Sequence, residues 1–280
     1  MTLPLSMSFN NMEDLMVYRD THQAIGITPA FVEILWDNFC HLDPYYLRDL
    51  LSPIAAEVSI HVMSTGITDR PISDYKRVLN NLAAHVRALK PSRVSDHLAR
   101  FTVDGLRMII PAEHTYTKLN HATERVHLYQ DAIGMPILLE NYASTTSAGA
   151  SQIHFLDTLR SKTGCGLLFD VSNAVVADLN GHLREDAWID YLKGQRVHSH
   201  MGSYRFNPTT QMYHDTHNEA PSPQALELLK KLTLQASISS VCYERDYDKT
   251  PENAESDLKA ILGAINHNRC PTPSPRSNSL

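Results

Sequence analysis

Residues 166–173 read GLLFDVSN, and this stretch carries the pattern that decides the fold. It begins as a short apolar run in which Leu167 and Phe169 face one way while Leu168 and Asp170 face the other, as successive side chains do in a β-strand. The stretch therefore predicts a buried strand that ends in a carboxylate, and Asn173 follows three residues later. A short apolar strand that ends in a side chain able to bind metal recurs along the chain.

Eight short β-type runs occur in the sequence, and segments with helical periodicity or helix-start residues separate them. The predicted strands are Leu5–Asn10, Phe31–Trp36, Glu57–Met63, Arg93–Leu98, Pro136–Asn141, Gly166–Val171, Arg196–Met201 and Ser240–Asp246. Strands that alternate with helices form a parallel sheet, because each helix serves as a crossover. Eight such repeats in 280 residues match the usual size of an α/β (β/α)8 TIM barrel.

The helical segments support this alternation. Leu79 and Val86 lie on one apolar face, Ser222 and Pro223 begin a second helix, and a last helix is predicted over 252–265. We predict one catalytic barrel domain over residues 1–267 and a disordered tail, rich in Pro, Ser, Asn and Arg, over 268–280. A doubly wound open sheet is the competing architecture. No GxGxxG motif follows the first strand, which weakens a dinucleotide-binding interpretation.

The composition excludes several classes of partner. With 25 Lys and Arg against 31 Asp and Glu, the formal charge is −6, so no basic surface for nucleic acid is expected. No stretch approaches the roughly 18 consecutive apolar residues of a membrane span. The N-terminus lacks the features of a signal peptide, and the four cysteines form no CxxC pair. We therefore expect a soluble, cytoplasmic protein with reduced thiols.

Six consecutive predicted strands, the third to the eighth, end in a residue able to bind metal. These residues are His61, His97, Glu140, Asp170, His200 and Glu244. In a barrel the strands converge at their C-terminal ends, where barrel enzymes keep their active sites. Side chains that are distant in sequence are therefore expected to meet within a few ångströms.

Two loop motifs extend this set to nine predicted ligands. Asn173 follows Asp170, and Asp215 and His217 are two residues apart, which lets both reach one ion. A single structural zinc needs about four ligands, so nine suggest two or three ions with bridging carboxylates. A mixed set of His, carboxylate and Asn suits iron or manganese better than a metal that prefers thiolates.

Other interpretations of single residues remain open. Any one of these histidines, taken alone, is more often a hydrogen-bonded core residue than a ligand. His198 is expected to pack beneath His200, His214 to lie in a loop, and His85 to be a solvated helix position. The charged run 244–246 could be a salt bridge at the rim, although alternation turns Glu244 toward the site.

The motifs, in this order, resemble those of the multinuclear non-heme iron-dependent oxidative enzymes, a family also called DUF692. They span residues 32 to 248 and read VEILWDNFCHLDP, VSIHVM, KPSRVSDHL, ILLENYAS, GLLFDVSNAVVADLN, HMGSY, DTHNE and CYERDYD. The similarity is strongest to members that act in methanobactin biosynthesis. All nine predicted ligands match the ligand types of the family.

The resemblance implies a TIM barrel that holds two or three irons in mixed Fe(II)/Fe(III) states and uses O2 as co-substrate. It implies one iron at His61, His97 and Glu140, and a second at Glu140, Asp170, His200 and Glu244. It implies a third at Asn173, Asp215 and His217.

The reaction that the resemblance implies oxidises a cysteine of an MbnA-like ribosomal precursor peptide to an oxazolone with a neighbouring thioamide. It also implies a heterodimer with an MbnC-like partner. Proton transfer in such a reaction needs a carboxylate nearby, and Asp215 or Glu140 is our choice of catalytic residue.

Three other functions are alternatives to a peptide oxidase. The strongest is a divalent-metal hydrolase or isomerase of the endonuclease IV-like or xylose isomerase-like type, which also places His, Asp and Glu at strand ends. The second is a metal-stabilised protein that escorts a peptide, and the third is a member of the same iron family that acts on a different peptide. The identity of the metal separates the first alternative from an oxidase.

Overall fold

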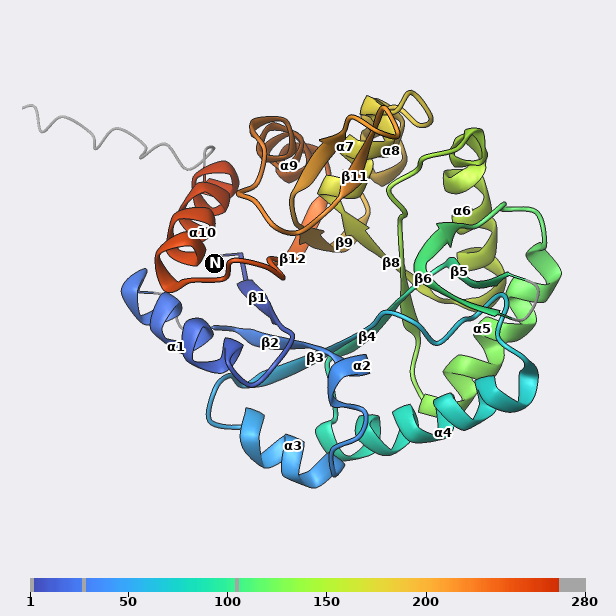
Figure 1. Ribbon diagram of the computed structural model, residues 1–280, viewed down its shortest axis with the longest axis horizontal. Helices are drawn as coiled ribbons and strands as arrows, with labels where there is room; N and C mark the ends of the chain where they lie inside the picture. Colours follow the sequence, from blue (N-terminus) through green and yellow to red (C-terminus); the bar gives the residue numbers. More distant parts are fainter. Residues whose placement is uncertain (1–2, 27–28, 104–105, 267–280) are drawn as a thin grey trace, which may run out of the picture.

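The computed structural model describes residues 3–26, 29–103 and 106–266, so the predicted tail, 268–280, lies outside the described residues. Eight parallel strands close into a barrel in the order β1-β12-β9-β8-β7-β4-β3-β2 (Figure 1). They are β1 (Leu5–Phe9), β2 (Phe31–Leu35), β3 (Glu57–Val62), β4 (Arg93–His97), β7 (Ile137–Glu140), β8 (Gly166–Asp170), β9 (Arg196–Met201) and β12 (Ser237–Tyr243). The predicted (β/α)8 barrel is confirmed.

Seven of the eight strands lie within one residue of their predicted ends, and the eighth is shifted. β12 begins three residues before its prediction and ends at Tyr243, so Glu244 lies just past the strand. The prediction failed at the polar start SISS, which resembles a loop. Pairing with β9, from Ser237 opposite Arg196 onward, holds these residues in the sheet despite a bulge after Ile238.

Helices cover the outside of the barrel (Figure 1). They are α1 (Asp14–Ala24), α2 (Trp36–Phe39), α3 (Pro44–Leu51), α4 (Ile72–Leu89), α5 (Leu119–Ile133), α6 (Gln152–Thr163), α7 (Val171–Leu179), α8 (Glu185–Leu192), α9 (Pro223–Gln235) and α10 (Pro251–Asn266), with a 3-10 turn at Ser147–Ser151. The apolar face of α4 is buried as predicted. α9 begins as predicted, because the Ser222 side chain accepts the Ala225 N–H and Pro223 occupies the first turn.

The prediction that His85 is solvated is wrong. Its side chain is fully buried on α4, and its ring lies edge-on to Trp36 of α2 with 5.7 Å between the ring centroids. The buried face of α4 is wider than the stripe that its aliphatic residues predict, because α3 and Trp36 of α2 also contact it.

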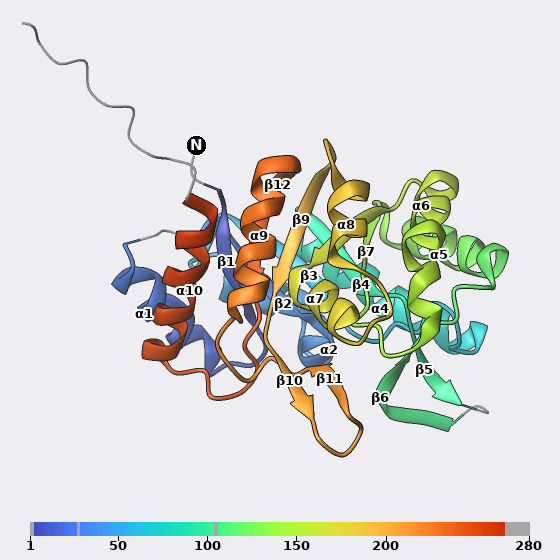
Figure 2. The same ribbon diagram turned by 90° about the horizontal axis from the view of Figure 1, so that it is seen from above.

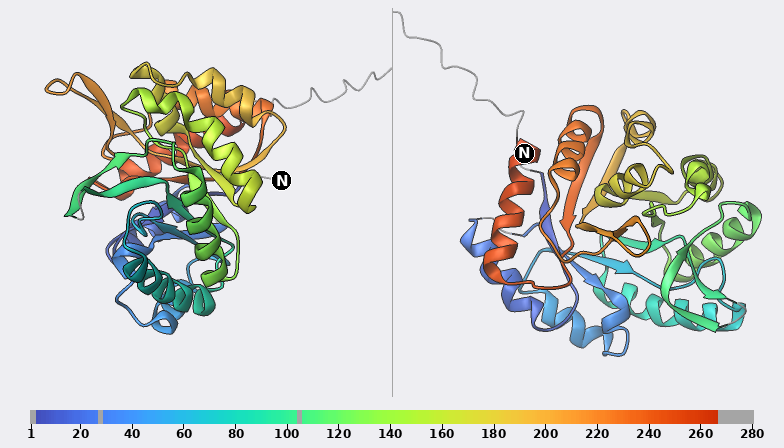
Figure 3. Two further views of the ribbon diagram at one scale, coloured as in Figure 1. Left: turned by 90° about the vertical axis from the view of Figure 1, so that its right-hand side faces the viewer. Right: turned by 45° about the horizontal axis from the view of Figure 1, so that its top comes forward.

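Two hairpins that the sequence did not predict follow β4 and β9. They are β5 (Ala99–Val103) with β6 (Leu106–Glu113), and β10 (Tyr204–Asn207) with β11 (Met212–Asp215). Both project from the same end of the barrel (Figures 2 and 3). His214 therefore lies in a strand opposite Arg205, and its prediction as a loop residue is wrong. No helix within the described ranges is long and apolar enough to cross a membrane.

Candidate metal centre

The six predicted strand-end residues lie together at one end of the barrel. The sheet register sets them at the same level: His97 of β4 is opposite Glu140 of β7, and Asp170 of β8 is opposite His200 of β9. Glu244 follows β12, where its backbone N–H is bonded to the Met201 carbonyl of β9. Parallel strands of similar length thus bring residues from six parts of the chain into one cluster.

One group of possible ligands consists of His61, His97 and Glu140. The two Nε2 atoms lie 3.6 and 3.3 Å from the same Glu140 oxygen, Oε2. Nδ1 of His61 is 2.9 Å from the Ser95 hydroxyl, which leaves Nε2 turned toward the carboxylate. The three ligand-type atoms can therefore face one ion, as a buried His-His-carboxylate set does in metal sites.

A second group shares Glu140 and adds Asp170, His200 and Glu244. Nδ1 of His200 lies 3.2 Å from Oε1 of Glu244 and 3.9 Å from Oε1 of Glu140. The two carboxylate oxygens of Glu140 thus face different groups, which is the geometry of a bridging ligand. These two groups have the same members as the two iron sites that the family resemblance implies.

Asp170 and Asn173 are held by the first turn of α7. Oδ1 of Asp170 caps the helix by accepting the Asn173 N–H at 2.6 Å. The Asn173 amide donates to the Asn141 carbonyl at 2.9 Å, and its nitrogen lies 3.4 Å from Oε1 of Glu140. Asn173 therefore lies beside Glu140, the residue that the two groups share.

Asp215 and His217 form a pair at the edge of the cluster. Nε2 of His217 is 2.9 Å from Oδ2 of Asp215 and 3.6 Å from Oε2 of Glu244. On the other side of the ring, Nδ1 is 3.1 Å from Oδ2 of Asp246. The structure thus brings these two predicted residues next to the second group. Neither belongs to a compact group of three or more His, Cys, Asp or Glu in the described part of the chain.

The consecutive charged residues Glu244, Arg245 and Asp246 each have a different partner. Glu244 faces the cluster, and Asp246 contacts His217. The buried Arg245 turns the other way, and its Nη1 is 2.6 Å from Oδ2 of Asp257 on α10. A salt bridge does form in this run, but it anchors the run to α10 and leaves Glu244 in the site.

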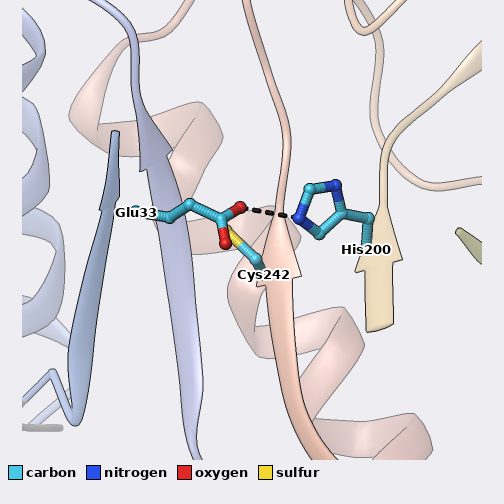
Figure 4. Close-up of side chains that lie close together, drawn as sticks. All are labelled: Glu33, His200 and Cys242. Carbon is cyan, nitrogen blue, oxygen red and sulfur yellow. Dashed lines mark ion pairs between the residues drawn. The ribbon is translucent and has the colours of Figure 1, made fainter. Parts of the chain in front are cut away.

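Glu33 of β2 and Cys242 of β12 were not predicted as site residues. With His200 they form another close group of ligand-type atoms (Figure 4). Oε1 of Glu33 is 2.6 Å from Nε2 of His200. The signal was present, because Glu33 is a single carboxylate inside the apolar run FVEIL. His198, two residues before His200 on β9, bonds Ser240 at 2.8 Å and belongs to none of the groups.

Burial and crowding shift the acid–base properties of the cluster. Burial lowers the pKa of His61 to about 3 and also lowers the pKa of His97, so both imidazoles are neutral. Burial, together with the nearby Glu244 and Asp170, raises the pKa of Glu140 well above its usual value. Burial also raises the pKa of Asp170 to about 7, with Asp215 and Glu244 adding to the rise.

Two histidines and one carboxylate are shifted toward their charged forms. Burial opposes the charge on His200, but Glu244 and Glu33 outweigh it and raise the His200 pKa well above its usual value. Asp215 and Glu244 do the same for His217. His200 and His217 in turn overcome the burial of Glu244 and hold its pKa well below the usual range. The acids and bases of the cluster therefore hold too few protons to neutralise all of its carboxylates.

The buried oxygens of the cluster test whether a cation fits it. Glu140 Oε2, Asp170 Oδ2, Asn173 Oδ1 and Asp215 Oδ1 are buried without a hydrogen-bond partner among the described residues. Buried acceptors without a partner are rare and costly. A hard or borderline cation would satisfy all four and separate the carboxylates, so the residues fit a metal ion.

A small cavity of about 40 Å³ lies above these groups and is lined by His61, His97, Asp215, His217 and Glu244, among others. A wider groove of about 530 Å³ adjoins it and shares Asn10, Leu35 and Asp246 with it. Exposed apolar side chains stand in this groove, with Met12 46% and Tyr247 68% exposed. The cluster therefore opens toward solvent on the β1–β2 side.

Gly202 is required for the position of the His217 ring, and we expect Gly202→Ala to displace that ring. A Cβ atom on Gly202 would lie 2.4 Å from Cδ2 of His217. The expected loss of unfolding free energy is about 1–3 kcal/mol, the usual cost of overpacking. Gly263→Ala on α10 is the matched control: its Cβ meets no atom within 4 Å, so up to about 1 kcal/mol of stabilisation is expected.

Urea unfolding measures both Gly variants, and a crystal structure of Gly202→Ala shows the ring. A His217 ring that keeps its contacts with Asp215 and Glu244 in that variant would contradict this assignment.

Comparisons with known proteins identify relatives of this chain. The sequence model of a family described as "RiPP precursor modification enzyme MbnB/TglH/ChrH" matches residues 14–262. A UPF0276 protein of Rhizorhabdus wittichii is 29% identical over 230 residues, which cover 79% of this chain and 81% of the relative.

Among solved structures, similar chains include an L-ribulose 3-epimerase and a xylose isomerase domain protein from Planctomyces limnophilus, each with a TM-score of 0.62. Their sequence identities are 12% and 11%, and the matches cover 93% and 95% of this chain and 94% and 98% of those chains. At this identity the likeness shows a shared TIM-barrel fold and nothing about the reaction.

Proposed function

The chain belongs to the MbnB/TglH/ChrH family of RiPP precursor modification enzymes, and from this membership we propose that it is an iron- and O2-dependent oxidase of a ribosomal precursor peptide. The observation that carries the proposal is the cluster of four histidines and four buried oxygens without a hydrogen-bond partner at the C-terminal end of the barrel. Its mixed nitrogen and oxygen ligands suit iron.

The nine predicted residues have distinct parts in this proposal. His61, His97 and Glu140 would hold one iron, and Glu140, Asp170, His200 and Glu244 a second. Asp215 and His217, with Asn173 nearby, would serve a third or complete the second. Iron held there would supply one-electron chemistry and open positions for a substrate thiolate and O2.

The rest of the chemistry falls to the chain itself. The groove at Asn10, Leu35 and Asp246 would admit a peptide side chain to the cavity, whose small volume excludes bulk water. Asp215 lines that cavity and has one oxygen without a partner, so it can accept a proton from the substrate. Glu140, the second choice, is less accessible because it lies beneath the histidines that face it.

The finer proposal is methanobactin-type chemistry, carried out as a heterodimer with an MbnC-like partner. A cysteine of an MbnA-like precursor would become an oxazolone with a neighbouring thioamide. Four electrons and four protons leave the peptide, and O2 takes them up to form two waters. The family membership supports a peptide substrate. The cysteine, the ring product and the partner rest on the motif resemblance.

Metal content and Mössbauer spectra of protein purified without oxygen from iron-supplemented cells test the oxidase. We expect two or more irons per chain, some of them antiferromagnetically coupled. Stoichiometric zinc or magnesium without coupled iron would contradict the proposal and favour a divalent-metal hydrolase or isomerase. Co-expression with a cysteine-bearing precursor then tests the finer proposal, with the loss of four hydrogen atoms read by mass spectrometry.

Fe(II) affinity is expected to fall as the pH falls through about 7. Asp170, whose pKa is raised to about 7, and His200, whose pKa is raised, must release protons before they can bind a metal. Below pH 7 each displaced proton should raise the apparent Kd roughly tenfold per pH unit. Anaerobic Fe(II) titrations between pH 5.5 and 8.5 measure this, and a flat profile would show that these groups do not bind the ion.

A further inference from the structure

Glu33 lies in the barrel interior on β2, just below the cluster, and its side chain is almost completely buried. One of its oxygens is already engaged, because Oε2 accepts the Ser59 hydroxyl at 2.6 Å and lies 3.9 Å from Nε of Arg93. The other oxygen, Oε1, lies 2.6 Å from Nε2 of His200 (Figure 4). Contacts from β3 and β4 therefore fix the carboxylate, and its free oxygen points at one histidine nitrogen.

The second nitrogen of His200 faces the opposite way. Nδ1 lies 3.2 Å from Oε1 of Glu244 and 3.9 Å from Oε1 of Glu140, inside the second ligand group. A neutral imidazole has one N–H donor and one acceptor nitrogen, and the partner of one nitrogen selects the role of the other. An ionised carboxylate only accepts, and Glu33, at 2.6 Å, lies nearer to the ring than Glu244, at 3.2 Å. Nε2 therefore keeps its proton when an ion displaces the proton on Nδ1, and the lone pair of Nδ1 is then free for the ion.

Glu33, His200 and Cys242 could in principle hold an ion of their own, since their ligand-type atoms lie close together. The contacts argue against this. One oxygen of Glu33 accepts the Ser59 hydroxyl, and the other is at hydrogen-bond distance from His200. The Cys242 thiol also bonds Glu33, so the carboxylate is already engaged by protein groups. A carboxylate bonded to the far nitrogen of a histidine is instead the arrangement that orients metal-binding histidines.

We propose that Glu33 is a positioning residue of the metal centre: its carboxylate holds the Nε2–H of His200 and so presents Nδ1 to the ion shared with Glu140 and Glu244. This inference rests on the proposed metal site but not on the identity of the metal. In this proposal a residue of the barrel core, one layer below the predicted ligands, selects which ring nitrogen of His200 binds the ion. Ser59 and Arg93 in turn keep Glu33 in place.

Glu33→Gln tests the proposal, because it keeps the volume and removes the charge. We expect the affinity of the second site for metal, measured by titration of Zn(II) and Fe(II), to fall about 10- to 100-fold. Ser59→Ala, which removes one bond to Glu33, should weaken binding in the same direction by less. In histidine-labelled, Zn(II)-loaded protein, long-range ¹H–¹⁵N spectra should show His200 with its proton on Nε2 and its metal on Nδ1, and Glu33→Gln should alter that pattern.

Cys242→Ala is the control that separates a positioning residue from a separate ion site. If Glu33 only orients His200, the alanine variant keeps the metal affinity of the wild type. Equal loss of metal in Cys242→Ala and Glu33→Gln would instead identify an ion site at Glu33, His200 and Cys242 and overturn the proposal. Unchanged affinity and an unchanged His200 spectrum in Glu33→Gln would also overturn it. Zinc in place of iron in the wild type would contradict the oxidase alone, since both readouts work with zinc.

Discussion

Glu140→Gln is expected to make the metal-free protein more stable while it abolishes metal binding and catalysis. The Glu140 carboxyl is buried beside Glu244 and Asp170, and its pKa is raised. The pKa of such an acid is higher in the folded state than in the unfolded state. When the pH rises above the unfolded-state pKa, the group lowers the stability of the fold, because folding must either protonate it or bury its charge. A neutral amide removes this cost at pH 7, and the expected gain is on the order of 1–3 kcal/mol.

The same substitution removes the one residue that both principal ligand groups share. Peptide oxidation should fall at least about 100-fold, since even residues that only orient metal ligands cost 10- to 100-fold when lost. The stabilisation that bound metal gives the wild type, seen as a rise in Tm, should be lost in the variant. Calorimetry with and without Fe(II), together with a turnover assay, measures the three effects.

Glu113→Gln is the matched control for Glu140→Gln. Glu113 is also a buried glutamate, but its oxygens accept bonds from the Ser144 hydroxyl at 2.5 Å and the Thr146 hydroxyl at 2.7 Å. Its replacement should therefore cost about 1–3 kcal/mol and leave metal binding intact. If Glu140→Gln destabilised the metal-free protein as Glu113→Gln does, Glu140 would be a structural residue and not a ligand.

The largest loss of stability is expected from Asp257→Ala. Asp257 of α10 is buried, lies 2.6 Å from Nη1 of the buried Arg245, and accepts the Tyr243 hydroxyl. Its removal leaves Nη1 of Arg245 and the buried Tyr243 hydroxyl without this acceptor, although Nε of Arg245 keeps its bonds to the Tyr247 and Asp248 carbonyls. Breaking a buried ion pair from one side costs about 3–5 kcal/mol. Urea unfolding followed by circular dichroism measures this loss.

Asp257→Ala should also lower metal occupancy, because Glu244 stands between Tyr243 and Arg245 and depends on their anchor. Lys259→Ala on the same helix is the control. Lys259 is exposed and pairs with Glu255 one turn away, so a change within about 0.5 kcal/mol is expected. An Asp257→Ala variant as stable as this control would show that the Arg245 contact contributes little and that the end of β12 is held by its sheet pairing.

The barrel could be predicted because each strand carries its own signal. Runs such as GLLFD and SIHVM alternate locally between two faces, and local alternation does not depend on the rest of the fold. The polar start of β12 shows the limit of that signal, since its pairing with β9 includes serines that are typical of loops. The hairpin at 204–215 was missed because its strands have only four residues each and none of these residues is fully buried.

The sequence by itself determined the number of barrel strands, their order along the chain and the identity of the residues at or next to their ends. Because parallel strands of a closed barrel end at one level, those residues were bound to meet. Only the tertiary structure decided which of them face each other: that Glu140 lies between two groups, that Asn173 lies beside it, and that Asp246 contacts the far side of the His217 ring.

The role of Glu33 and the buried position of His85 also depended on the tertiary structure. Whether a polar side chain is buried, and which partner it meets, is set by neighbours that are distant in sequence. A strand pattern gives the direction of a side chain. It does not give the distance to the next strand's side chain, which depends on the register and closure of the whole barrel.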